Sequence, residues 1–177
     1  AQNTVHKAVS ILDCEPAVGA LYGEFLVGAV LYQLALAPAE RVQFSVEHQG
    51  SAGKIFGDVR PGVCVRGQLE NPSAEGTLLG PSASMHVSRQ GVGSGGHYES
   101  IIKVPRRKIA DAFQVCALQS DQVLSFVALD VRFHGAELKW AAGLFVQALP
   151  GATHEHLAEM TSCLEQARFE DRLVAAK

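Results

Sequence analysis

The sequence contains few cysteines, and their spacing excludes the common cysteine-based sites. The four thiols lie about 50 residues apart, so no two of them form the Cys-x-x-Cys pair of a zinc site or a redox-active disulfide. Most fall in segments with periodic apolar residues, where cysteine acts as a small buried side chain. We therefore expect no metal site, and free thiols in a reducing, cytoplasmic compartment. The cysteines are Cys14, Cys64, Cys116 and Cys163.

A large excess of charge and a long uninterrupted apolar run are also missing. Fifteen basic residues against eighteen acidic ones give a net charge of −3, which provides no overall attraction for phosphate groups. The richest apolar stretch, residues 17–37, is interrupted by Glu24 and Gln33 and is typical of a buried helix. Residues 1–7 lack the apolar segment of a secretory signal. These features predict a soluble protein without nucleic-acid or membrane partners.

The sequence does contain enough apolar residues for one substantial core. Apolar residues make up 47% of the chain and charged residues 19%, a balance typical of globular rather than disordered proteins. A chain of 177 residues has the size of one domain and buries about 70% of the surface that its unfolded form exposes. We expect an α+β core over residues 1–152, followed by a C-terminal helical segment over residues 153–177.

Apolar periodicity predicts an α+β fold with a mainly antiparallel sheet packed against helices. Four segments show helical spacing, and Pro16 and Pro38 follow the first two of them. Alternating apolar and polar residues between glycine-rich turns predict the strands, the first three as a meander. The predicted helices cover residues 4–12, 18–36, 109–117 and 153–176, and the predicted strands cover residues 42–46, 55–59, 63–69, 84–88, 98–104, 124–133 and 138–149.

Three motif-like clusters have a simpler structural interpretation. Gly91, Gly93 and Gly96 match Gly-x-Gly-x-x-Gly, but a phosphate-binding loop opens a helix and a strand follows here, so we interpret them as a hairpin tip. Residues 154–156, His-Glu-His, lack the histidine spacing of a zinc helix and are interpreted as a solvated helix start. Residues 106–108, Arg-Arg-Lys, are interpreted as an exposed helix start rather than an anion site.

No group of residues forms a recognisable catalytic constellation. Seven histidines and many serines and aspartates allow numerous triads on paper, but a triad is defined by geometry that a sequence does not supply. From the residues alone we expect no catalytic residue and no cofactor. A binding or structural protein is therefore favoured over an enzyme.

Several segments, in order along the chain, resemble one known protein family. They are Gly-Glu-Phe-Leu at 23–26, Val-Arg-Gly at 65–67, Ser-Asp-Gln at 120–122 and Ala-Ala-Gly-Leu-Phe-Val-Gln-Ala-Leu-Pro-Gly-Ala at 141–152. Together they resemble the core domain of the heat-shock protein 33 family of redox-regulated bacterial chaperones. The residues that carry the resemblance, and for which it implies a structural role, are Gly23, Glu24, Arg66, Gly67, Ser120, Gln122, Gly143, Gln147 and Pro150.

The sequence departs from this family at the redox switch. The family's switch is a C-terminal zinc module with a Cys-x-Cys and a Cys-x-x-Cys motif, and the four cysteines here match neither. The turn at residues 49–53 also lacks the family's usual aspartate. We therefore expect a divergent member without the zinc redox switch, which is either the core fragment of a longer protein or a natural member that lacks the switch.

The resemblance implies a function in protein folding under stress. It predicts an ATP-independent holding chaperone, or the client-binding core of one, that captures unfolding proteins on exposed apolar surface. The alternative is a zinc-less relative repurposed as an adaptor or structural protein for one specific partner. Suppression of aggregation across unrelated clients distinguishes the two, because an adaptor is selective.

The resemblance also implies a homodimer, because family members exchange helices near this end of the chain. The C-terminal segment continues its apolar stripe past the point where the core is complete. The alternative is a helix folded back onto its own core. The residues predicted near the dimer or partner contact are Leu157, Met160, Leu164, Phe169 and Leu173.

Overall fold

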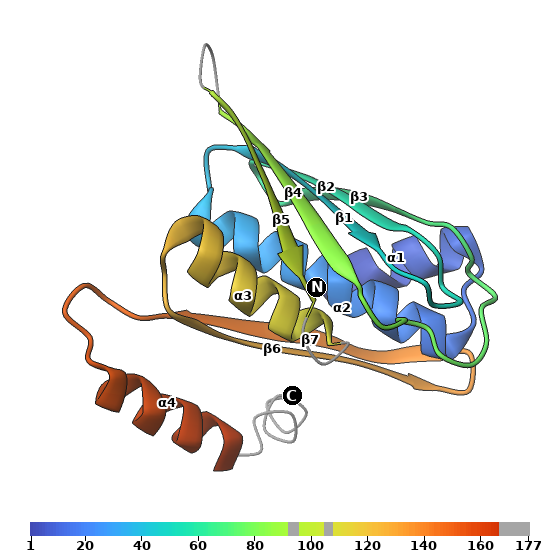
Figure 1. The fold of residues 1–177 in the computed structure, drawn as a ribbon. Coiled ribbons are helices and arrows are strands. Elements are labelled where there is room, and N and C mark those ends of the chain that lie inside the picture. Colours follow the sequence, from blue (N-terminus) through green and yellow to red (C-terminus); the bar gives the residue numbers. More distant parts are fainter. Residues whose placement is uncertain (92–95, 105–107, 167–177) are drawn as a thin grey trace.

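The structure is a computed structural model that describes residues 1–91, 96–104 and 108–166. Runs of helices and runs of strands follow one another along this part of the chain, which confirms the α+β arrangement predicted from the sequence (Figure 1). The elements are α1 (Gln2–Leu12), α2 (Pro16–Leu36), β1 (Arg41–Glu47), β2 (Ile55–Arg60), β3 (Cys64–Leu69), β4 (Ser84–Gln90), β5 (His97–Lys103), α3 (Ile109–Asp121), β6 (Ser125–His134), β7 (Glu137–Gln147) and α4 (His154–Gln166).

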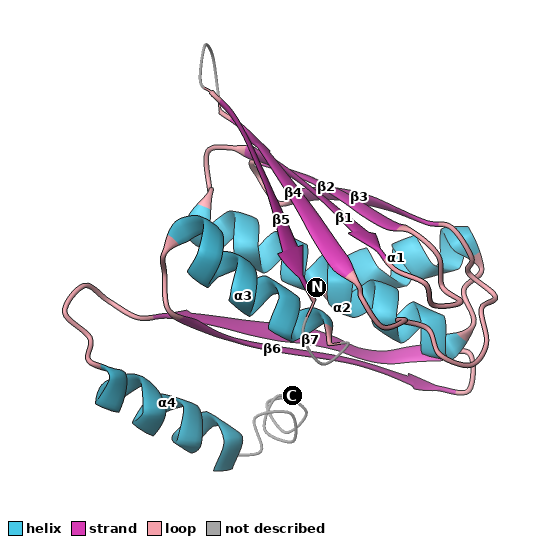
Figure 2. Cartoon of the chain, viewed as in Figure 1, coloured by secondary structure: helices cyan, strands magenta, loops and turns pink. Residues whose placement is uncertain are grey.

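The strands form two antiparallel sheets with α1, α2 and α3 between them (Figure 2). One sheet has five strands in the order β3-β2-β1-β4-β5, and the other is the hairpin β6-β7. Strands β1 to β3 form the predicted meander, whereas β4 returns to pair with β1. As a result, β3 and β5 are the two edges of the larger sheet.

Helix α2 lies at the centre of the core. By length and composition it could cross a membrane, but most of it is buried against both sheets and α3, as in a core helix. Gln33, which interrupts the apolar stretch, is itself fully buried. Its Nε2 donates to the carbonyls of Ala37, Pro38 and Glu40 just past the helix end, at 3.1 to 3.2 Å. The side chain therefore supplies a donor where the chain leaves the helix.

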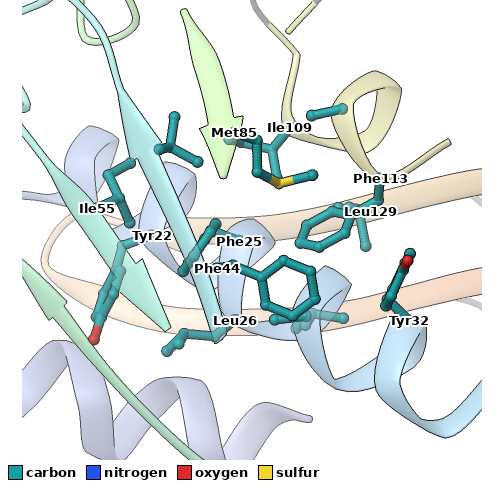
Figure 3. Close-up of a cluster of buried hydrophobic side chains, with 14 of the residues drawn as sticks. Tyr22, Phe25, Leu26, Tyr32, Phe44, Ile55, Met85, Ile109, Phe113 and Leu129 are labelled. Atoms are coloured by element: carbon teal, nitrogen blue, oxygen red, sulfur yellow. The ribbon is translucent and has the colours of Figure 1, made fainter. Parts of the chain in front are cut away.

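Four aromatic rings join α2 to the five-stranded sheet and to α3 (Figure 3). The Phe44 ring from β1 lies 5.2 Å from the Phe113 ring of α3 and 5.4 Å from the Tyr32 ring of α2, centroid to centroid. Their planes are inclined at 72° and 89°, which are the edge-to-face contacts that aromatic pairs prefer. Phe25 of α2 completes the cluster with an edge contact to Phe44.

Two of the motif-like clusters lie partly outside the described residues. Residues 92–95 of the glycine-rich stretch lie outside the described residues. The strands β4 and β5 on either side pair antiparallel, as the hairpin interpretation requires. Residues 106–107 of the basic run also lie outside the described residues, and Lys108 is the exposed residue before α3. Residues 154–156 begin α4. Within the described ranges no three His, Cys, Asp or Glu residues are grouped as metal ligands would be.

Candidate functional site

A buried carboxylate on β2 gathers guanidinium groups at one end of the five-stranded sheet. Asp58 is 1% exposed, and Arg41 on β1 donates to it from Nε at 2.7 Å and from Nη2 at 2.9 Å. Arg66, its cross-strand neighbour on β3, donates from Nε at 2.9 Å, and Nη2 of Arg60 lies 3.9 Å away. Hydrogen bonds from Arg41 and Arg66 hold the pKa of Asp58 below its usual value. The carboxylate is therefore ionised at neutral pH.

This arginine cluster presents positive charge to solvent. The side chains of Arg60 and Arg66 are 56% and 69% exposed, whereas that of Asp58 is buried. Three cations around one carboxylate leave this end of the sheet positive, although the whole chain carries −3. Sequence reasoning selected Arg66 but missed Asp58. The available signal was an acidic residue between apolar positions of a predicted strand.

A second ionic network connects α2, β4 and α3. Arg89 of β4 donates from Nε to Glu40 at 2.9 Å and from Nη2 to the Leu36 carbonyl at 3.1 Å, and its Nη1 pairs with Asp121 at the end of α3. Tyr32 of α2 donates its hydroxyl to the same Asp121 carboxylate. Burial raises the pKa of Tyr32 far above its usual value, so the phenol stays protonated. The network fixes the end of α3 against the sheet.

The Ser-Asp-Gln segment forms the end of α3. The hydroxyls of Ser120 and Ser100 on β5 lie 2.9 Å apart, and Gln122 ends the helix in the left-handed conformation with φ of 57°. Asp121 between them is the member of the ionic network, and the sequence analysis did not select it. The resemblance pointed to this segment without indicating which of its side chains bears the ionic contact.

Three glycines of the resemblance lie where a side chain would collide with the core. A Cβ on Gly67 of β3 would lie 2.4 Å from the Tyr22 hydroxyl, and one on Gly143 of β7 would lie 2.8 Å from side chains of α2 and β6. Gly23 of α2 faces Val5 of α1 in the same way, at 2.8 Å. The close approach of these elements therefore requires residues without a side chain.

The remaining residues of the resemblance are dispersed. Gln147 of β7 donates from Nε2 to the Ala35 carbonyl of α2 at 3.4 Å. Glu24 is half-buried on α2, and Pro150 is exposed in the turn after β7. The structure thus brings Arg66 and Gly67 together at β3, and Ser120 and Gln122 at α3, but does not unite the set in one site.

Of the residues predicted at the dimer contact, the described part of the structure includes only the side chain of Met160, which is half-buried on α4. Leu157 and Leu164 belong to α4, but their side chains lie outside the described part, and so do Phe169 and Leu173 entirely. The contact itself therefore stays a prediction. Figure 1 places α4 outside the two-sheet core.

The four cysteines lie on different parts of the fold. Cys116 of α3 is buried and Cys14, between α1 and α2, is half-buried, and burial raises the pKa of both thiols to about 11. Cys64 of β3 and Cys163 of α4 are exposed. The raised pKa keeps the two covered thiols protonated and unreactive near neutral pH.

Several large apolar side chains are exposed on the described surface. Exposed apolar side chains contribute to surfaces that bind other proteins. They are Ile11, Leu34, Val63, Tyr98, Ile101, Leu118 and Leu149.

Comparisons with known proteins agree on one family. A family model described as Hsp33 protein matches residues 1–175. The 33 kDa chaperonin of Thermus thermophilus is 34% identical over 164 residues, which cover 85% of this chain and 48% of that protein. The 33 kDa chaperonin of Desulfotalea psychrophila is 26% identical over 167 residues, which cover 88% of this chain and 56% of that protein.

The fold matches a solved structure from the same group of proteins. The crystal structure of the 33 kDa chaperonin (heat shock protein 33 homolog) of Thermotoga maritima aligns with a TM-score of 0.74 and 22% identity, over 82% of this chain and 53% of that chain. The chain spans about half the length of the curated relatives it matches.

Proposed function

The chain belongs to the Hsp33 family, and from this premise we propose that it is an ATP-independent holding chaperone or the client-binding core of one. The match of the family model over residues 1–175 carries the proposal. Exposed apolar side chains support it, because burying apolar surface gains about 25 cal/mol per Å² for an unfolding client. The glycine-rich stretch joins two antiparallel strands, which supports a function without nucleotide at that loop.

We also propose that the holding activity of this chain works without a zinc redox switch. The spacing of the cysteines supports this, since they lie about 50 residues apart along the sequence and match no ligand motif. Free thiols, two of them with raised pKa values, suit a reducing compartment, so we place the protein in the cytoplasm. We assign it no catalytic step.

The test is light scattering of two unrelated heat-unfolded enzymes, with and without this chain, in reductant and in peroxide. We expect equal suppression of aggregation for both enzymes under both conditions. Suppression in peroxide alone would contradict the switch-independent activity. No suppression of either enzyme would contradict the chaperone proposal and favour an adaptor for one specific partner, to be sought by affinity capture.

We further propose that residues 153–177 form a separate segment that makes a homodimer contact. The position of α4 outside the two-sheet core supports it, as does the spacing of Leu157, Met160 and Leu164 along one helix. Leu164→Asp is expected to convert dimers to monomers in multi-angle light scattering. Ser162→Asp, on the same helix, is the matched control, and an unchanged dimer mass for Leu164→Asp would contradict the contact.

A further inference from the structure

A groove runs along the outer edge of β3, between this strand and α1. Its volume is about 740 Å³, and residues 64–67 of β3 line one side while Lys7 and Ile11 of α1 line the other. Ile11 is 72% exposed and Val63, at the start of the groove, is 51% exposed. In Figure 1, α1 lies next to the β3 edge of the five-stranded sheet. The groove thus has both apolar and charged lining residues, and an edge strand forms one of its walls.

The backbone of β3 is available for further pairing in this groove. Strand β3 pairs with β2 on one side only, so alternate residues direct their N–H and C=O groups away from the sheet. In the described chain, residues 64–68 form no backbone hydrogen bond except with β2. The four lining residues span about 13 Å at ~3.3 Å per residue, the length of a short added strand. An extended segment can therefore continue the sheet here.

The charge along the groove determines which kind of segment fits. Lys7, Arg60 and Arg66 line it, and its one acidic residue, Asp58, is buried and already paired with arginines. A second copy of β3 added at this edge would carry its own Arg66 into the groove beside the cations already there, and like charges across strands are unfavourable. The groove therefore suits an acidic occupant rather than another copy of this chain.

A second, apolar pocket of about 240 Å³ adjoins the groove at Thr4 and Val63. It is lined mainly by α2 side chains, among them Leu26, Val30 and Leu34, and no charged side chain lines it. Apolar surface of this kind favours a large apolar side chain at one end of the occupant. The occupant thus combines an apolar anchor with acidic residues.

The residue between the two cavities has an unusual backbone. Val63 lines both and has φ of 62°, in the left-handed region that β-branched residues rarely adopt. Strained backbone of this kind persists where the surrounding structure holds it, and it gathers at binding sites. Here it keeps an apolar side chain at the junction of the groove and the pocket.

We propose that this groove binds an extended segment of another protein, with an apolar anchor and acidic residues, as a strand added to β3. The assignment deepens the proposed function and rests on it for the source of the segment, which is an unfolding client protein. Backbone hydrogen bonds to β3 give such binding its tolerance of different sequences, and the flanking cations select acidic ones.

The test measures fluorescence anisotropy of a labelled seven-residue peptide that begins with leucine and alternates valine with glutamate. The full chain is expected to bind it at least about tenfold more tightly than the same peptide with lysine for glutamate. Lys7→Glu should weaken binding about fivefold, whereas Lys103→Glu, an exposed lysine at the opposite edge strand, should leave it unchanged. Equal binding of both peptides, or equal effects of both variants, would overturn the proposal.

Strand pairing is tested without altering the protein. Two further peptides carry N-methyl groups on alternate residues, one on the odd and one on the even positions, so that each loses the backbone donors along one edge. Only one of them should lose binding, since one edge of an added strand faces β3. Unchanged binding of both would overturn the strand addition. The aggregation assay measures holding activity and the peptide assay measures binding at this groove. A negative result in one is therefore distinguishable from a negative result in the other.

Discussion

Replacing Asp121 by alanine is expected to destabilise the fold by about 3 kcal/mol. Its side chain is 10% exposed and accepts hydrogen bonds from Arg89 and Tyr32. Without it, the Tyr32 hydroxyl loses its acceptor and Arg89, 14% exposed, keeps only Glu40 and the Leu36 carbonyl. Breaking one partner of a buried pair costs about 3–5 kcal/mol, and the remaining carboxylate of Glu40 places the cost at the lower end.

Urea unfolding followed by circular dichroism measures this cost. With a slope of about 2 kcal/mol per M for a chain of this size, the Asp121→Ala midpoint should fall by about 1.5 M. Tyr32→Phe keeps the pair with Arg89 and should cost about 1 kcal/mol. Glu47→Ala removes an exposed pair with Lys54 and should leave the midpoint unchanged. An Asp121→Ala midpoint within about 0.3 M of the parent would refute the view that this network holds α3 to the sheet.

Three further substitutions test other features of the fold. The pKa of Asp58 is lowered in the folded state, so the carboxylate stabilises the fold above about pH 4, its pKa in the unfolded chain, and this stabilisation is lost as the pH falls through the folded pKa. Asp58→Asn should therefore make the urea midpoint less dependent on pH in the acid range. An unchanged pH dependence would contradict this. Val63→Asn should raise the midpoint by about 0.5 M, equivalent to about 1 kcal/mol, because asparagine tolerates positive φ, and a fall would show that the backbone there is unstrained. Gly67→Ala should cost about 1–3 kcal/mol by collision with Tyr22, while Gly96→Ala, with no atom within 4 Å, should be neutral; equal thermal midpoints would contradict the close packing.

Helices and strands were predictable from the sequence because their periodicity reflects which face is buried. The alternation in β1, for example, places Val42, Phe44 and Val46 on the core side. The pairing of β4 with β1 was not predictable in this way, since periodicity defines the faces of a strand and not its neighbours. The extent to which α2 is buried was also only partly predictable, because Gln33 is polar and yet 0% exposed.

The two ionic networks were not predictable, because their main partners lie apart in the sequence, on different elements. A lone aspartate in a strand or at a helix end is normally solvent-exposed. Only the register that sets Asp58 opposite Arg66, and the fold that brings Asp121 to Arg89, turns these residues into buried partners. The resemblance supplied Arg66 and the segment around Asp121, but not the interactions that explain them.

The positions of the two networks bear on the proposed groove. Arg89 lies opposite Val42, on the core face of the sheet, while Asp58 lies opposite the next residue, Gln43, on the other face. One end of the sheet is therefore held by ion pairs on both faces, and the first residues of β3 belong to that end through Arg66. A fixed edge strand gives up little conformational freedom when it accepts another strand, so the networks favour binding by preorganising the backbone of β3. Asp58→Asn, which removes the ion pairs with Arg41 and Arg66, should therefore weaken peptide binding at this edge even where Lys7 is intact.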